Sequence, residues 1–416
     1  MPGNRGRRIG MTESNEAGSL AELAVFGAAP LFSRARTTGQ LANRDPDRFF
    51  ALASGAFERR WLTNQGPLVQ ELEERLCRFH GTAHCVTFAN ACFALALALR
   101  TLARPGAKRV LLPALTFRGL PHLIRWAGLE PQYCDVDPVT HTLAPESLAR
   151  HIGPDTAAVL AVDNVNALCD IDAIERLTGA AGVPLLMDCV YGIGGSYGRD
   201  RVGSRGRASV FSLHATKLIN GFEGGYLTTD DDALALDLRS QRNFGFGDDG
   251  VVRQLGLNGK LNELHAAFAL SNLPHVQSIV DGNAERFAAY RHGLAGIPWV
   301  SFADYSRSPG TYSLVLLRVA PDAPYTRDAL IRILRAENAL VRPYYAPPLH
   351  RVDPVPASGG APAVELPVSD RVSREFIQMP VGDLVSVEDI GAISRFFTTL
   401  DRRSGSIAGR LRELPR

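Results

Sequence analysis

The sequence predicts an α/β fold with a large domain, built on a mostly parallel central sheet covered by helices, and a smaller C-terminal α+β domain. Short apolar runs alternate with helical patterns between residues 84 and 188, which is typical of a parallel sheet with helices on both faces. A long helical region follows, and strand and helix patterns resume near residue 313. The 416 residues are enough for two domains. We expect a disordered leader over 1–24, the large domain over 25–272 and the small domain over 273–416.

The N-terminal part begins without regular structure. Residues 1–24 are polar, Gly-rich and aperiodic, and their arginines are not followed by the apolar stretch of a signal peptide. We expect an unstructured leader, with Met11 as an alternative start. Helical periodicity then covers 45–60 and 68–80, on either side of a loop that ends at Gly66-Pro67.

The βα repeats follow, and strands and helices alternate to the end of the large domain. Strands are expected at 85–88, 109–112, 131–134, 157–162, 185–187, 208–212 and 226–229, and helices at 92–102, 118–126, 145–151, 171–181 and 233–239.

The C-terminal part begins with a long helical region over 256–294 that Pro274 interrupts. Beyond it we expect a strand at 313–319, a helix at 326–338, a surface loop at 352–364 and a frayed tail after Arg402.

Composition excludes several classes of protein. Hydrophobic residues make up 45% and charged residues 21% of the chain, the balance of a soluble globular protein. A formal charge of +2 is too small to indicate binding to nucleic acid or to a membrane surface, and no stretch is long enough to span a bilayer. The six cysteines lack the spacing of a metal site, so we expect no metal and reduced thiols in the cytoplasm.

One lysine stands out as a candidate nucleophile. The chain has only three lysines among its 45 basic residues, and Lys217 follows the apolar strand 208–212 and precedes a glycine-rich bend. A lysine held between such elements is expected to be partly buried, which lowers an amine's pKa and makes it able to attack a carbonyl. The alternative is an ordinary loop lysine.

Other polar and aromatic side chains stand, like Lys217, at the ends of strands, where ligands bind in parallel α/β sheets. The set fits pyridoxal 5′-phosphate, which needs a lysine for its aldehyde, an acid at its ring nitrogen, an anion site and a planar group over its ring. Asp188 is the candidate acid, the helix start at 90–92 with Ser212 the candidate anion site, and Phe117 the candidate planar group. Taken singly, each has a structural alternative as a cap, a core residue or a satisfied strand hydroxyl.

Motifs that follow one another from about residue 25 to residue 400 strengthen this interpretation. They are WLTNQGPLVQELE (61–73), LPALTF (112–117), CDVDPVTHTL (134–143), RVGSRG (201–206), FSLHATK (211–217), EGG (223–225), RNFGF (242–246), GLNGKLNELHAA (256–267) and YYAPPLHR (344–351). In this order they resemble the DegT/StrS family of pyridoxal-phosphate-dependent sugar aminotransferases, which has the fold-type I, aspartate-aminotransferase-like architecture.

The resemblance implies roles for the candidate cofactor residues. Lys217 would be the Schiff-base lysine, Asp188 the partner of the pyridinium nitrogen and Phe117 the stacking aromatic. The phosphate would be surrounded by Asn90, Ala91, Cys92 and Ser212.

The resemblance also implies a homodimer with shared active sites, a nucleotide-linked keto-sugar as acceptor and an amino-acid donor such as glutamate. Asn258 and Lys260 would reach the neighbouring subunit's cofactor phosphate. The motif variants are most similar to members that aminate C4 of dTDP-4-keto-6-deoxysugars. We expect the sugar to contact loops near 61–67, 242–250 and 342–350, with Asn64, His214, Tyr344, Tyr345 and His350 as candidate substrate-binding residues.

Three departures from the family pattern cluster around the cofactor. The chain has Asn90-Ala91-Cys92 for Ser/Asn-Gly-Thr, Tyr191 for a histidine or glutamine, and a different segment at 162–166. A tyrosine at 191 can donate a hydrogen bond to the cofactor's 3′-oxygen, or it can pack as an ordinary aromatic.

These observations leave three functions open. The first is an aminotransferase in which freed Lys217 moves the proton and pyridoxamine phosphate forms as an intermediate. The second is a pyridoxal-phosphate enzyme of another reaction type on a non-sugar substrate. The third is a non-catalytic regulatory relative, which the intact Lys217 and Asp188 argue against.

Overall fold

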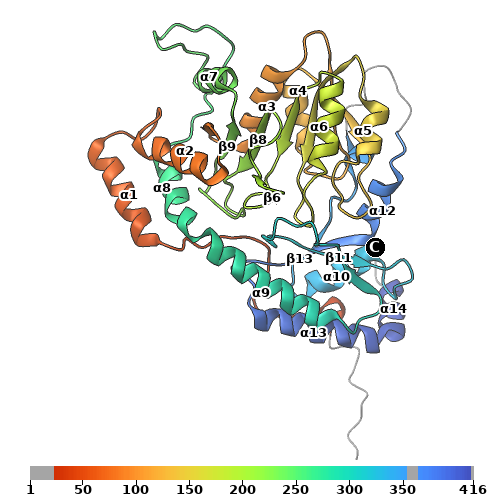
Figure 1. The fold of residues 1–416 in the computed structure, drawn as a ribbon. Helices are drawn as coiled ribbons and strands as arrows, with labels where there is room; N and C mark the ends of the chain where they lie inside the picture. Colours follow the sequence, from red (N-terminus) through yellow and green to blue (C-terminus); the bar gives the residue numbers. More distant parts are fainter. Residues whose placement is uncertain (1–22, 354–363, 414–416) are drawn as a thin grey trace, which may run out of the picture.

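The computed structural model describes residues 23–353 and 364–413, which form two packed units (Figure 1). The large unit contains a seven-stranded sheet, and the small unit contains a four-stranded antiparallel sheet. The predicted α/β class, with a mostly parallel sheet followed by a smaller α+β part, is therefore confirmed.

The strands of the large sheet lie in the order β1-β9-β8-β5-β4-β2-β3, and the pairs among β8, β5, β4, β2 and β3 are parallel. Only β9 runs against its two neighbours. The carboxyl ends of the other six strands therefore lie at one edge of the sheet. The bounds are β1 His84–Phe88, β2 Arg109–Pro113, β3 Glu130–Cys134, β4 Thr156–Val162, β5 Leu185–Asp188, β8 Ala208–Ser212 and β9 Gly225–Thr229.

Two apolar cores cover the two faces of this sheet because successive side chains of a strand point to opposite faces. In β4, Val159 and Ala161 pack into one core, while Ala158 and Leu160 pack into the other. The first core includes helices α2 (Pro67–His80), α5 (Pro145–His151), α6 (Ile171–Ala180) and α8 (Glu263–Asn272), and the second includes α3 (Ala91–Leu102), α4 (Leu120–Trp126) and α7 (Asp232–Gln241).

Helices α8 and α9 carry the chain from the large unit to the small one (Figure 1). The predicted break at Pro274 is a short 3-10 turn, Leu273–His275, between α8 and α9 (Val276–Leu294). The small sheet has the order β10-β11-β13-β12. Its unit comprises β10 Val300–Phe302, β11 Val315–Val319, α10 Arg327–Ala336, β12 Arg342–Pro343, α11 Leu349–Val352, α12 Pro367–Glu375, β13 Phe376–Met379, α13 Val387–Arg402 and α14 Ser404–Glu413.

The structure corrects the predicted ends of the chain. Residues 1–22 of the predicted leader lie outside the described residues, but Leu23 is buried in the core of the small unit and Ala24 begins a 3-10 turn. The segment 23–40 contacts the small unit, with bridges from Arg36 and Gly39 to C-terminal residues. The expected frayed tail is helix α14, because Ile407 is fully buried against the same core. Most of the loop predicted at 352–364 lies outside the described residues.

Two further elements complete the described chain. Helix α1 (Pro46–Arg59) lies at one end of the large unit and packs against α8 (Figure 1). A small hairpin, β6 (Ser196–Tyr197) with β7 (Asp200–Arg201), was not expected from the sequence. None of the helices in the described ranges is long and apolar enough to cross a membrane.

Candidate active site

A cavity of about 660 Å³ lies at the carboxyl edge of the large sheet, where the small unit meets it. Ten of the predicted site residues line it: Asn90, Ala91, Cys92, Phe117, Asp188, Tyr191, Ser212, His214, Lys217 and Tyr345. The topology explains this convergence, because the segments after β1, β2, β5 and β8 all leave the sheet at that edge.

Lys217 is held in a tight loop between β8 and β9. Its N–H donates to the His214 carbonyl at 2.8 Å, and the loop closes through the Ala215 N–H bonded to the Phe222 carbonyl. The Leu213 N–H donates to the Gly224 carbonyl at 2.9 Å, just before β9 begins. The loop backbone therefore fixes where the half-buried lysine enters the cavity.

The Lys217 amine contacts the side chain of Tyr191. Its Nζ lies 3.3 Å from the Tyr191 hydroxyl and 4.3 Å from the centre of the ring. The phenol therefore accepts a hydrogen bond from the amine, and the ring face is close enough for cation–π attraction. Tyr191 therefore lies against the Lys217 amine, and its contact with the cofactor's 3′-oxygen stays a prediction.

Asp188 is the last residue of β5 and is 5% exposed. Its pKa is raised to about 6, mainly because the group is buried; the Val190 N–H and Lys217 oppose the rise, and the nearby Asp163 adds to it. Its Oδ1 accepts a hydrogen bond from the Val190 N–H at 3.2 Å, the one hydrogen bond of this carboxyl group within the described ranges. A buried carboxylate that accepts so few hydrogen bonds is suited to pair with a cationic group of a ligand.

The start of α3 opens into the cavity at Ala91 and Cys92. Asn90 is the N-cap, and its side-chain oxygen accepts from the Phe93 N–H at 2.9 Å. Gly225 lies so close that a Cβ there would be 2.3 Å from the Ala91 nitrogen. The first backbone N–H groups of α3 have no partner inside the helix and favour an anion.

Aromatic and polar side chains form the remaining walls. Phe117 is 54% exposed and follows β2. The Ser212 hydroxyl accepts from the His214 N–H at 3.2 Å, and the His214 ring lies 3.0 Å from the Thr216 hydroxyl. Tyr345 enters from the small unit with a left-handed φ of 45°, and burial beside Tyr191 raises the pKa of its phenol well above the usual value.

Five predicted residues do not line the cavity. Tyr344 is fully buried and accepts a hydrogen bond from Asn164, and the His350 side chain is buried 3.2 Å from Asp370. Asn64 is exposed in the loop before α2. Asn258 and Lys260 lie beside Asn243, whose Oδ1 accepts from the Lys260 amine at 3.0 Å. Tyr344 and His350 therefore belong to the packed interior, and the other three residues lie on parts of the chain outside the cavity.

The loop 61–67 and the segment 256–267 meet at the start of α2. The fully buried Glu263 accepts from the Leu68 and Val69 N–H groups at 3.0 and 2.9 Å. Gly66 is required beside it, because a Cβ would lie 2.5 Å from the Glu263 carboxyl carbon. The sequence motifs at both places are therefore explained in part by one helix cap.

Sequence reasoning missed three arginines in the cavity wall. Arg118 follows Phe117, while Arg335 and Arg342 come from the small unit together with Gln378. No motif marks α10, and the contact of these residues with the cavity depends on how the two units pack.

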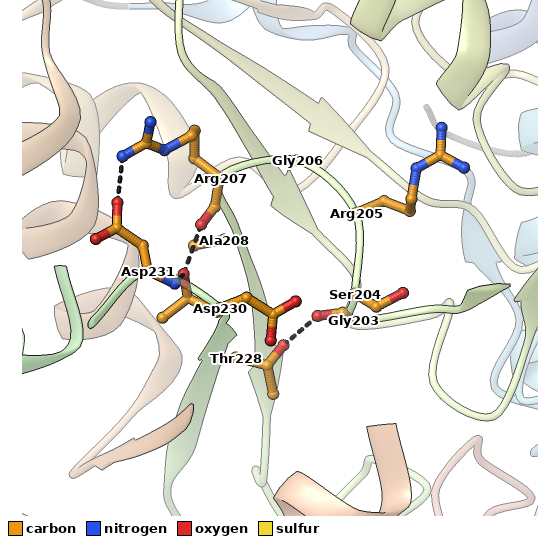
Figure 2. Close-up of a pocket in the computed structure, with 10 residues that line it drawn as sticks. Gly203, Ser204, Arg205, Gly206, Arg207, Ala208, Thr228, Asp230 and Asp231 are labelled. Atoms are coloured by element: carbon orange, nitrogen blue, oxygen red, sulfur yellow. Dashed lines mark hydrogen bonds and ion pairs between the residues drawn. The ribbon is translucent and has the colours of Figure 1, made fainter. Parts of the chain in front are cut away.

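A second hollow, of about 290 Å³, lies at the opposite end of β8 and β9 (Figure 2). Its charged groups are occupied within the chain: Arg205 pairs with Asp172, Glu175 and Asp200, and Arg207 pairs with Asp231. The Thr228 hydroxyl donates to the Gly203 carbonyl at 2.7 Å. This part of the RVGSRG motif therefore closes the far end of the sheet.

Comparison with known proteins agrees with this geometry. Over 328 residues, 78% of this chain and 88% of the relative, the sequence is 28% identical to a dTDP-4-amino-4,6-dideoxy-D-glucose transaminase of Escherichia coli. It is 29% identical over 78% of its length to the erythromycin biosynthesis sensory transduction protein EryC1 of Saccharopolyspora erythraea, of which it covers 87%.

A solved structure and a family model extend the match. The crystal structure of DesI in the presence of its TDP-sugar product superposes with a TM-score of 0.88 and 33% identity, over 95% of this chain and 100% of that one. The family model covers residues 45–397. The chain belongs to the DegT/DnrJ/EryC1/StrS aminotransferase family.

Proposed function

We propose that this enzyme is a pyridoxal-phosphate-dependent aminotransferase that converts the keto group of a nucleotide-linked keto-deoxysugar to an amine, with an amino acid such as glutamate as donor. The observation that carries the proposal is that Lys217 and the buried Asp188 line one cavity with the start of α3. The relative from E. coli is named for a dTDP-sugar and the DesI structure was solved with a TDP-sugar product, and both support the substrate class. Such a reaction serves secondary-metabolite or surface-sugar biosynthesis.

The residues of the cavity fit the cofactor. The N–H groups of Ala91 and Cys92, with the Ser212 hydroxyl, suit its phosphate, because a helix start favours anions. The carboxyl group of Asp188, buried and short of partners, suits a protonated ring nitrogen. When bound, pyridoxal phosphate supplies an aldehyde that links to amines and a ring that accepts electrons.

The protein's part in the reaction is to place charges and move one proton. Lys217 Nζ holds and returns the proton, and the Tyr191 hydroxyl 3.3 Å away orients the amine. Asp188 as a carboxylate keeps the ring nitrogen protonated, and Phe117 offers a flat face at the end of β2. Tyr345 and its neighbours in the small unit complete the lining of the cavity and so reduce the access of water to Lys217.

The proposal includes a homodimer with shared active sites in the cytoplasm. Support comes from an exposed apolar surface on the segment 244–255, where Phe244, Val251, Val252 and Leu255 are 46%, 55%, 59% and 63% exposed. Exposed apolar residues gathered on one segment are typical of a contact surface. Lys260 lies over the Phe244 ring at 4.7 Å, so the residues predicted to reach a neighbouring subunit adjoin this segment. The six free cysteines suit a reducing compartment.

The test is amination itself. The purified enzyme is given pyridoxal phosphate, glutamate and a dTDP-4-keto-6-deoxyhexose, and mass spectrometry follows the conversion of ketone to amine. Turnover with transfer of nitrogen from ¹⁵N-glutamate supports the proposal. Binding of the cofactor without amination of any keto-sugar nucleotide would favour the alternative of another reaction type, and failure to bind the cofactor would favour the non-catalytic alternative.

A further inference from the structure

Three arginines form a positive wall on one side of the cavity. Arg118 comes from the segment after β2, Arg335 from the end of α10 and Arg342 from β12. The acids of the cavity, Asp188 and Glu223, come instead from the ends of β5 and the loop before β9. The acids and Lys217 therefore come from the large unit, whereas two of the three arginines come from the small unit and the third, Arg118, is bonded to a small-unit carbonyl.

None of these three arginines forms an ion pair with a carboxylate in the described part of the chain. Nearby arginines of the small unit behave differently: Arg351 pairs with Asp370 at 2.6 Å and Arg318 with Glu375 at 2.7 Å. Arginines left without carboxylates around one cavity repel one another, and an anionic ligand relieves that repulsion.

Backbone carbonyls hold two of the three side chains in place. The Arg335 Nε–H donates to the Val341 carbonyl at 2.8 Å, and an Arg118 Nη2–H donates to the Ala346 carbonyl. Each bond uses only part of the guanidinium and leaves other N–H groups for a ligand. Gln378, directly opposite Arg342 in the β12–β13 register, adds an amide to the same wall.

We propose that Arg118, Arg335 and Arg342 bind the diphosphate of the sugar nucleotide, and so place its sugar toward Lys217. The assignment rests on the proposed function and adds to it the residues that recognise the anionic part of the substrate. A single carboxylate is satisfied by one bidentate arginine, whereas a diphosphate carries two charges and many acceptor oxygens. Three arginines at one wall therefore match a diphosphate better than the carboxylate of the amino donor.

The test compares holoenzyme variants by calorimetric titration with dTDP and with thymidine. Arg342→Gln is the first variant, because the Arg342 side chain forms no hydrogen bond or ion pair within the described ranges and the fold should tolerate its loss. We expect it to weaken dTDP binding by about tenfold or more, since hydrogen bonds to charged groups are strong, and to leave thymidine binding unchanged. Arg342→Lys, which keeps the charge, should recover part of the loss. Arg318→Gln, whose partner is Glu375 outside the cavity, is the matched control.

Steady-state kinetics separates the two possible anions. Arg118→Gln, Arg335→Gln and Arg342→Gln should each raise KM for the keto-sugar nucleotide about tenfold and leave KM for glutamate unchanged. A raised KM for glutamate alone would overturn the assignment in favour of the donor's carboxylate. Unchanged dTDP affinity in Arg118→Gln, Arg335→Gln and Arg342→Gln would overturn it while amination by the wild type still upheld the proposed function. A wild type that neither binds dTDP nor aminates a dTDP-keto-sugar would remove both.

Discussion

The Nζ nitrogen of Lys217 lies 3.3 Å from the hydroxyl oxygen of Tyr191. Lys217 comes from the loop after β8 and Tyr191 from the segment after β5, so the contact joins two neighbouring strand ends. It places a phenol at the nitrogen that holds and returns the proton in the proposed reaction, at a position where the sequence departs from the pattern expected for the family.

Tyr191→Phe tests this contact because it removes only the hydroxyl. A phenol that donates to the cofactor's 3′-oxygen favours the deprotonated oxygen. Loss of the hydroxyl should raise the pH midpoint at which the cofactor's visible absorption changes by about one unit. A shift of one unit corresponds to the free energy of about one charge-assisted hydrogen bond. Spectrophotometric titration measures the shift. Tyr325→Phe, whose hydroxyl donates to the Leu400 carbonyl in the small unit, is the control. An unchanged midpoint together with unchanged turnover would assign Tyr191 to packing alone.

Asp188 makes the stability of the cofactor-free protein depend on pH. Its pKa is about 6 in the folded chain against an ordinary value of 3.8, so between these values the folded state binds more protons than the unfolded state. The free energy of unfolding therefore falls as pH rises through this window. Asp188→Asn removes the cost of ionising this buried carboxyl group. As pH rises from 4 to 6, the variant should become more stable than the wild type by roughly 3 kcal/mol at most, and the difference should stay constant above pH 6.

Urea unfolding of both proteins at pH 4.5, 5.5 and 7.5 checks this expectation. A difference in stability that does not change with pH would contradict the raised pKa.

The same substitution, Asp188→Asn, should cost the holoenzyme several orders of magnitude in turnover, since the ring nitrogen loses the acid that keeps it protonated. Near-wild-type turnover would show that Asp188 acts as a structural cap.

Glu263 should matter for stability rather than for chemistry. Glu263→Gln replaces one of the two oxygens that cap α2 with an N–H₂ group that faces a backbone donor. We expect a loss of about 1–3 kcal/mol in the free energy of unfolding. Glu74→Gln, in an exposed i,i+4 pair with Arg78 on the same helix, should change it by less than about 0.5 kcal/mol. Equal effects for the two variants would remove the cap as an explanation of the motif around Glu263.

The shared active site of the proposed dimer can be tested by mixing two inactive variants. If Lys260 serves the neighbouring subunit's site, Lys217→Ala and Lys260→Ala should regain activity after subunit exchange, because some mixed dimers contain one intact site. Activity assays before and after exchange give the result, with each variant alone as control. A stable and active monomer in sedimentation would contradict both the dimer and the shared site.

The sequence predicted the part of the site that depends on strand ends. Asn90, Asp188, Ser212 and Lys217 are far apart in the chain, yet parallel strands deliver them to one edge of the sheet, and they line one cavity. Their local patterns are strong because each ends or follows a buried apolar strand. The class of the fold followed from the same alternation of strands and helices.

The parts that the sequence did not predict depend on contacts between distant segments. Arg335 and Arg342 reach the cavity only because the small unit packs over the large one. The cap from Glu263 to Leu68 joins residues 195 positions apart. Ile407 gives too short an apolar pattern to indicate helix α14, which is ordered by burial against the small unit's core. Tertiary packing decides each of these features.

The central claim is that Lys217 is the amine that binds pyridoxal phosphate, and borohydride reduction of the holoenzyme tests it most directly. Reduction should trap the cofactor covalently, and peptide mapping by mass spectrometry should place the adduct on Lys217. The Lys217→Ala variant, treated in the same way, should give no adduct. An adduct on Lys108 or Lys260 in the wild type, or none on any lysine, would contradict the account.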